Sequence, residues 1–311
     1  MRKKVNLPIS VLEFNDYLLN IKGKSIKTVN GYNLDLKMFF SFYKLHKEKK
    51  STDDISNVNI TRISINDIQK ITLDDLYEFI NYLVKKKNCA NTRNRKIATL
   101  KSYFRFLLKK KYIQENIAED LETAKIPTKE VLVPTDEEVE KIFNSLDGGS
   151  KLYVRNKAIL TVLAYSGLRA EECSNLKLID VDMEDKKIIV KNGKGAKDRI
   201  LFMNDIIYSN LVEYLEKRNN ENEYLWINEN GKNLKKDMIQ RIVKDCVDKA
   251  GLRDKGYSTH NLRKYFATRL YKISNNNILL TSKALGHSSI EVTQKYLGIK
   301  LDDLREIMIK L

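Results

Sequence analysis

Residues 158–172 read Ala158-Ile-Leu-Thr-Val-Leu-Ala-Tyr-Ser-Gly-Leu-Arg-Ala-Glu-Glu172. The first seven are almost entirely apolar, which predicts a helix buried in a hydrophobic core. Gly167 breaks this helix, and Arg169 follows with Glu172 three residues later. An arginine presented at a helix end can be held by such a carboxylate while its planar fork faces a phosphate. In isolation, the same two residues could equally be an ordinary surface ion pair.

Upstream of this stretch, Pro127 and Pro134 mark a segment with no helical or strand period. We therefore expect an interdomain linker at 126–134, between an N-terminal domain at 1–125 and a C-terminal domain at 135–311. The sequence Thr135-Asp-Glu-Glu138 has the form of a capping box and should begin a helix that runs through Phe143.

The N-terminal part predicts helices, because apolar residues recur in it at spacings of three and four. The expected helices are 9–21, 25–47, 72–87 and 91–111. The fourth combines an apolar face with a strongly basic one. Any one of these cations could simply be solvated, but their clustering favours contacts with DNA phosphates. The residues concerned are Arg93, Arg95, Lys96, Lys101 and Arg105.

The C-terminal part adds one clear hairpin to its helices, with strands at 186–191 and 199–203. The protein is therefore expected to be mainly α with a small antiparallel β-sheet. At the hairpin tip, glycines flank Lys194, and Lys197 and Arg199 follow as further candidates for DNA contacts. The glycines let the backbone approach a ligand closely, although a solubilising turn has the same composition.

Composition points to a polyanionic partner. The 311 residues contain 57 Lys+Arg and 41 Asp+Glu, a formal net charge of +16, which favours nucleic acid. There is no apolar run long enough for a membrane helix, so we expect a cytoplasmic protein. The three cysteines suit neither a disulfide framework nor a zinc site. Phosphate-binding and dinucleotide glycine motifs are also missing, so we expect neither cofactor nor metal.

Two further motifs lie near the C-terminus. In the first, His260 and Arg263 are three residues apart at a helix start and should share one face; capping or a core hydrogen bond is the alternative role for the histidine. The second runs from Leu285 to Tyr296, with His287 before the expected helix and Tyr296 on it. Ser288 and Glu291 have capping-box spacing there. Because the chain holds 16 tyrosines, Tyr296 stands out only through its neighbours.

Taken together, the four motifs resemble the catalytic domain of the tyrosine recombinases, the phage-integrase and Xer-like family. They occur in the family's order and at similar spacing, and the N-terminal helices resemble its SAM-like core-binding domain. The motifs are Gly167-Leu-Arg-Ala-Glu-Glu172, Gly193-Lys-Gly-Ala-Lys-Asp-Arg199, His260-Asn-Leu-Arg263 and Leu285-Gly-His-Ser-Ser-Ile-Glu-Val-Thr-Gln-Lys-Tyr296.

The resemblance implies a site-specific recombinase that cleaves and rejoins double-stranded DNA through a 3′-phosphotyrosine intermediate. Tyr296 would attack the phosphate, Glu172 would support the first arginine, and five residues would surround the phosphate: Arg169, Lys194, His260, Arg263 and His287. Two departures are visible. Lys264 stands where many members have a second histidine, and Leu297-Gly298 follows the tyrosine where many have Thr-His.

These residue types suit the reaction. A tyrosine hydroxyl ordinarily has a pKa of about 10, so at pH 7 the site must offset roughly 4 kcal/mol to ionise it. Two arginines and a lysine can stabilise a phenolate and the charge that grows on phosphate oxygens. His260 is suited to accept the phenol proton, the resemblance implies that Lys194 protonates the leaving 5′ oxygen, and His287 should hold the phosphate.

Three alternatives remain at this level: a type IB topoisomerase, which uses similar chemistry; a DNA-binding factor without catalysis; and, less favoured, a metal-dependent nuclease. In the tail, Leu301, Leu304, Met308 and Leu311 share a helical face. It could dock on its own domain, whereas the resemblance implies docking on a neighbouring protomer in a tetramer on synapsed DNA. The expected DNA sites are inverted repeats on bacterial nucleoid DNA, with an accessory protein as a further partner.

Overall fold

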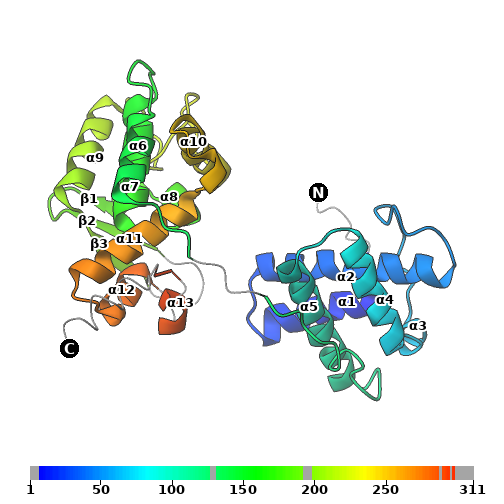
Figure 1. Ribbon diagram of the computed structural model, residues 1–311. Coiled ribbons are helices and arrows are strands. Elements are labelled where there is room, and N and C mark those ends of the chain that lie inside the picture. Colours follow the sequence, from blue (N-terminus) through cyan, green and yellow to red (C-terminus); the bar gives the residue numbers. More distant parts are fainter. Residues whose placement is uncertain (1–6, 127–130, 192–197, 287–288, 295, 298–311) are drawn as a thin grey trace. The chain divides into compact units, whose positions relative to one another are not determined.

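The computed structural model describes residues 7–126, 131–191, 198–286, 289–294 and 296–297. The chain divides into two compact units, Met1–Thr128 and Lys129–Leu311 (Figure 1). Each has its own hydrophobic core. Among the described residues, no helix combines the length and the hydropathy that a membrane span requires.

The N-terminal unit is helical, as predicted. All four expected helices form, and a short fifth one, α3, lies in a stretch where no helix was expected. The elements are α1 (Ile9–Asp16), which continues into the π-helical turn η1 (Tyr17–Ile21), then α2 (Ile26–Lys47), α3 (Ile65–Gln69), α4 (Leu73–Lys85) and α5 (Ala90–Lys109). Capping boxes begin α3 at Ser64 and α4 at Thr72, which satisfies backbone donors that a helix start otherwise leaves unpaired.

Aromatic side chains dominate the core of this unit. Phe14 of α1 packs edge-on against Tyr103 of α5, and Phe39 of α2 packs edge-on against Phe79 of α4, with ring centroids 5.4 and 5.3 Å apart. All four rings are fully buried. Such pairs add stabilisation to the hydrophobic burial of each ring, so they hold α1 against α5 and α2 against α4.

Helix α7 lies at the centre of the C-terminal unit, with other helices packed around it (Figure 1). Its described elements, in chain order, are α6 (Asp136–Asn144), α7 (Tyr153–Ser166), α8 (Ala170–Asn175), η2 (Leu178–Asp180), β1 (Val181–Asp182), β2 (Lys187–Val190), β3 (Arg199–Phe202), α9 (Asp205–Lys217), α10 (Lys236–Lys249), η3 (Arg253–Lys255), α11 (Thr259–Ile273), α12 (Ile278–Leu285) and α13 (Ile290–Gln294). The predicted capping box of Thr135 and Glu138 is present and begins α6.

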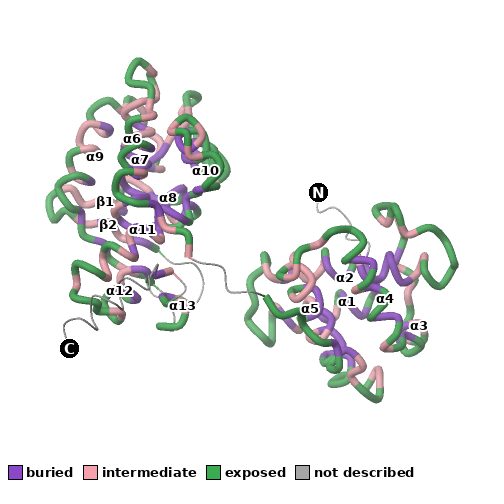
Figure 2. The backbone as a smooth tube through the Cα atoms, in the orientation of Figure 1, coloured by how far each residue is buried: buried purple, intermediate pink, exposed green. Residues whose placement is uncertain are grey.

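The apolar stretch quoted first forms the buried centre of this unit. From Ala158 to Ala164, every residue of α7 is buried (Figure 2), as expected for a helix that is apolar all round. Helix α7 packs against α9 and α11. It therefore supplies a fixed base for the residues that follow its C-terminus.

A three-stranded antiparallel sheet, in the order β1-β2-β3, completes the unit. Ile188 pairs with Leu201 and Val190 pairs with Arg199 across the predicted hairpin. The predicted fold class, mainly α with a small antiparallel sheet, is confirmed. The tip of the hairpin lies outside the described residues.

Candidate active site

The turn after α7 positions the first arginine. Gly167 ends the helix with a φ of +65°, and a Cβ on this residue would collide with the ring of Phe266 in α11. Only glycine combines this left-handed conformation with so close an approach. The chain then turns into α8, which begins directly after Arg169.

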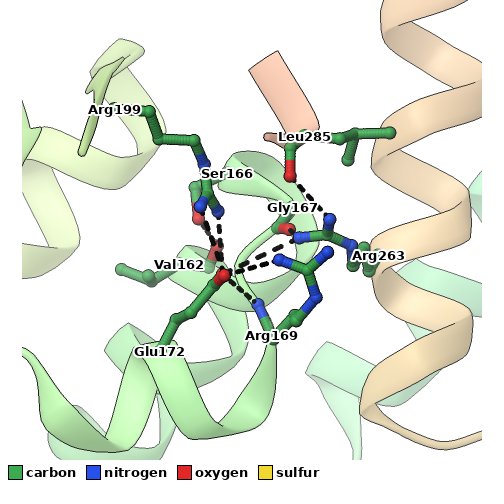
Figure 3. A network of polar contacts seen from close by, with 8 residues as sticks. All are labelled: Val162, Ser166, Gly167, Arg169, Glu172, Arg199, Arg263 and Leu285. Carbon is green, nitrogen blue, oxygen red and sulfur yellow. Dashed lines mark hydrogen bonds and ion pairs between the residues drawn. The ribbon is translucent and has the colours of Figure 1, made fainter. Parts of the chain in front are cut away.

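The Glu172 carboxylate pairs with two arginines of the site, Arg169 and Arg199. Its Oε2 accepts a hydrogen bond from the backbone N–H of Arg169 at 2.8 Å, and its Oε1 accepts one from that residue's Nη1 at 2.7 Å. Arg199 of β3 donates Nη1 and Nη2 to the same two oxygens at 3.2 and 2.8 Å. Figure 3 shows the carboxylate at the meeting point of these arginines.

The surroundings of Glu172 keep it ionised. Its side chain is 11 % exposed, and burial alone would raise the pKa of the carboxyl group. The hydrogen bonds and charges of Arg199 and Arg169 outweigh burial and lower the pKa to about 2. The site therefore contains a permanent negative charge that holds two guanidinium groups.

Among the described arginines of the site, Arg263 is the most buried, with a side chain 1 % exposed. Its Nη1 donates to the carbonyl oxygen of Gly167, and its Nη2 donates to that of Leu285 at 2.7 Å. These carbonyls lie at the C-terminal ends of α7 and α12, where helix dipoles favour a positive charge. Burial and the positive charge of Arg169 nevertheless lower the pKa of Arg263 to about 10.

His260 and Tyr296 lie next to each other. Their ring centroids are 4.9 Å apart in an edge-to-face arrangement, and the Arg263 Cζ lies 5.6 Å from the centroid of the Tyr296 ring. His260 remains partly exposed to solvent, yet its pKa lies below the ordinary 6.5. Partial burial is the first cause, followed by the charges of Lys264 and Arg263. A neutral imidazole beside a phenol can accept its proton.

The structure thus brings together Arg169, Glu172, His260, Arg263 and Tyr296. Tyr296 lies just beyond the C-terminal end of α13 rather than within the helix, and its N–H donates to the carbonyl of Thr293 at 2.9 Å. Other predicted residues lie outside the described residues: Lys194, Lys197, His287, the capping residue Ser288 and the tail from 298 to 311.

The residues of α5 that were predicted to contact DNA differ in how far their side chains are exposed. Lys96 is buried, at 5 % exposure, and its Nζ donates to the buried Asp35 at 3.0 Å, which does not fit a phosphate contact. Arg95 donates its Nη2 to the same carboxylate at 2.7 Å but is 51 % exposed. Asp35 also accepts a hydrogen bond from the Thr99 hydroxyl, which helps to fix its carboxylate. The fixed carboxylate in turn orients the exposed guanidinium of Arg95.

The other basic residues of α5 are at least partly accessible. Arg93 donates to the carbonyl of Asn88 at 2.6 Å, and Lys101 donates to that of Glu119 at 2.8 Å. The guanidinium of Arg105 pairs with the Glu119 carboxylate at 3.0 Å while remaining largely exposed. An exposed ion pair such as that of Arg105 with Glu119 is weak, so a phosphate can displace it.

Arg199 does not fit the predicted DNA contact either, because its side chain is 8 % exposed and points to Glu172. A signal for this placement was present in the sequence. Strand β3 alternates between the two faces of the sheet, and Arg199 shares a face with the buried Leu201. The alternation should have placed the arginine inside.

Two family models match the chain. The model of the phage integrase family matches residues 133–301, and that of the phage integrase N-terminal SAM-like domain matches residues 59–111. The chain belongs to the phage integrase family. The predicted resemblance is confirmed, and with it the enzyme class of tyrosine site-specific recombinases.

Similarity to tyrosine recombinases extends over nearly the whole of this chain. The tyrosine recombinase XerC of Caldanaerobacter subterraneus subsp. tengcongensis is 33% identical over 305 residues, which cover 96% of this chain and 85% of the relative. XerC of Halalkalibacterium halodurans is 29% identical over 94% of this chain and 93% of the relative. The crystal structure of XerH bound to its difH substrate aligns with a TM-score of 0.68 at 24% identity, over 92% of this chain and 80% of that one.

Proposed function

We propose that this integrase-family protein cleaves DNA through nucleophilic attack by Tyr296 on a phosphodiester. The phenol oxygen bonds to the phosphorus, the bond from phosphorus to the 5′ oxygen breaks, and the protein becomes joined to the 3′ phosphate. Attack by a 5′ hydroxyl from another strand reverses the step and completes strand exchange. The link retains the energy of the broken bond, so no ATP is needed.

Arg169 and Arg263 stabilise the charge that develops on the non-bridging oxygens. Both are fixed before DNA binds, the first by Glu172 and the second by two helix-terminal carbonyls. Preorganised donors of this kind supply a large share of catalysis, because they need no rearrangement during the reaction. The other two phosphate-facing residues in this proposal are Lys194, which protonates the leaving 5′ oxygen, and His287, which holds the phosphate.

The proton of Tyr296 passes to His260. The two rings are in contact, and the lowered pKa of His260 keeps the imidazole neutral near pH 7. Burial of the nearby Arg263 strengthens its field at the phenol oxygen. The contact between His260, Arg263 and Tyr296 is the observation that carries this mechanism.

The partner in this proposal is double-stranded DNA with inverted-repeat sites, bound by a tetramer at the bacterial nucleoid, with an accessory protein where synapsis requires one. The relative XerH is described in complex with a DNA substrate, and a net charge of +16 supports the same partner here. The domain limits that we propose are 1–125 and 135–311, joined by a linker at 126–134; the division into units at Thr128 supports them.

Trapping of a covalent adduct tests the mechanism. Purified protein is incubated with fragmented genomic DNA of the source organism, and the mixture is separated on a denaturing gel. The wild type should give a DNA-bound band that nuclease trims, whereas Tyr296→Phe should bind DNA but give none. An adduct of equal intensity in the variant would contradict the assignment of the nucleophile. Sequencing of the trapped DNA identifies the cleavage site.

A further inference from the structure

We propose that Arg199 is a positioning residue for DNA cleavage: it neutralises Glu172 and thereby leaves Arg169 and Arg263 directed at the phosphate. This inference rests on the proposed function, because it concerns the same site. It gives Arg199 a role different from the phosphate contact predicted for it.

Arg199 supplies a large share of the hydrogen bonds that Glu172 accepts. Among the residues that the structure describes, four donors lie within 3.2 Å of the two carboxylate oxygens, two from Arg169 and two from Arg199. A carboxylate offers about four lone-pair sites. The bidentate pair with Arg199 therefore occupies half of the acceptor capacity of Glu172.

Arg263 lies close to Glu172 without a hydrogen bond to it. Its Nη1 lies 3.8 Å from Oε2 of Glu172, too far for a hydrogen bond. If Arg199 were removed, half of the acceptor sites of a buried carboxylate would lose their donors, and the nearest guanidinium groups are those of Arg263 and Arg169. Because an incompletely paired buried charge is costly, Arg263 would move into hydrogen-bond distance of Glu172, and Arg169, which already donates Nη1 to it, would turn further toward it. Both shifts lead away from a bound phosphate.

The packing around Arg199 supports a fixed role. Gly286 has a φ of +63°, and a Cβ on it would lie 3.0 Å from the Cδ of Arg199. The arginine thus passes from β3 beside the C-terminus of α12 to reach α8. Arg199 approaches the Glu172 carboxylate from a different side than Arg169 and Arg263 do, as the labelled residues in Figure 3 show.

Charge restoration separates positioning from a merely structural role. Arg199→Gln removes one of the two guanidinium groups that hydrogen-bond to Glu172 and leaves the carboxylate hydrogen-bonded to Arg169 alone among the described residues. The double variant Glu172→Gln/Arg199→Gln removes one charge of each sign, so the net charge of the site returns to its original value. The glutamine at 172 also keeps an oxygen that can accept the backbone N–H of Arg169. A double variant that is faster than the single one would show that the defect lies in the incompletely paired carboxylate.

The assay is single-turnover cleavage of a nicked duplex that carries the sequence recovered from the trapped adduct. Arg199→Gln should lower the cleavage rate by about 10²-fold, and the double variant should recover about tenfold of that loss. Arg199→Lys, which keeps the charge but loses the bidentate fork, should lie between wild type and Arg199→Gln. Affinity for the duplex should change by less than about threefold, because Arg199 does not contact DNA in this account.

Arg155→Gln is the matched control. Arg155 is a buried arginine of α7 that donates to the carbonyl of Ile227 at 3.0 Å, outside the site. Its replacement should destabilise the unit without changing the cleavage rate at a temperature where the variant is folded. A rate for Arg199→Gln within about threefold of wild type, or a double variant no faster than Arg199→Gln, would overturn the inference. Absence of an adduct in the wild type would instead overturn the proposed function.

Discussion

Replacement of Glu172 by glutamine should destabilise the C-terminal unit strongly at neutral pH. The structure lowers the pKa of this carboxyl group from 4.5 to about 2, which corresponds to about 3 kcal/mol of stabilisation of the folded state. Breaking a buried ion pair by removing one partner costs about 3–5 kcal/mol. Both arguments give the same size of effect for Glu172→Gln at pH 7.

The effect must also depend on pH. Because the folded-state pKa lies below the unfolded-state value, the stabilisation is complete above about pH 5 and is lost as the pH falls toward 2. The difference between wild type and variant should shrink to less than about half by pH 3. Urea unfolding can follow this through the only tryptophan, Trp226, which is fully buried in this unit.

Glu223→Gln serves as the control, because Glu223 pairs with Lys177 while 63% exposed. Such a pair should contribute less than about 1 kcal/mol. A loss below about 1 kcal/mol for Glu172→Gln, or one equally large at pH 3 and pH 7, would refute the argument that this carboxylate is the buried counter-charge of the site.

Three further predictions concern other parts of the structure. Gly286→Ala should slow single-turnover cleavage and lower thermal stability by about 1 kcal/mol, because its positive φ and the contact with Arg199 oppose a Cβ; unchanged values would contradict this packing. The cleavage rate should rise with pH through a midpoint below 6.5, since the pKa of His260 is lowered, and a midpoint above 7 in a rate profile would exclude that base. Asp35→Asn should destabilise the N-terminal unit by about 3 kcal/mol in chemical denaturation, because Lys96 stays buried without its counter-charge; a loss below about 0.5 kcal/mol would refute it.

Local patterns predicted the fold well. Apolar spacing located the helices of the N-terminal unit, and strand alternation with a glycine-rich turn located the hairpin. Helix α3 was missed because its five residues are too few to establish a helical period. Motif spacing also brought together His260 and Arg263, because residues three apart share a helix face.

Contacts between distant residues could not be predicted in the same way. The pair of Asp35 with Lys96 joins two helices 61 residues apart, and no local pattern links them. Lys96 lies at the border between the basic and the apolar face of α5. From such a position a long side chain can turn inward to a buried carboxylate. For Arg199, the alternation of β3 was a usable signal, but its partner Glu172 lies on a different element.

Mass spectrometry of the trapped adduct identifies both the nucleophile and the phosphate to which it is joined. After nuclease trimming and trypsin digestion, cleavage at Lys295 and Lys300 gives the peptide Tyr296-Leu-Gly-Ile-Lys300, which contains a single tyrosine. We expect this peptide to carry a nucleotide joined through its 3′ phosphate to the phenol oxygen of Tyr296. A nucleotide attached to any other residue, or joined through a 5′ phosphate, would contradict the proposed mechanism.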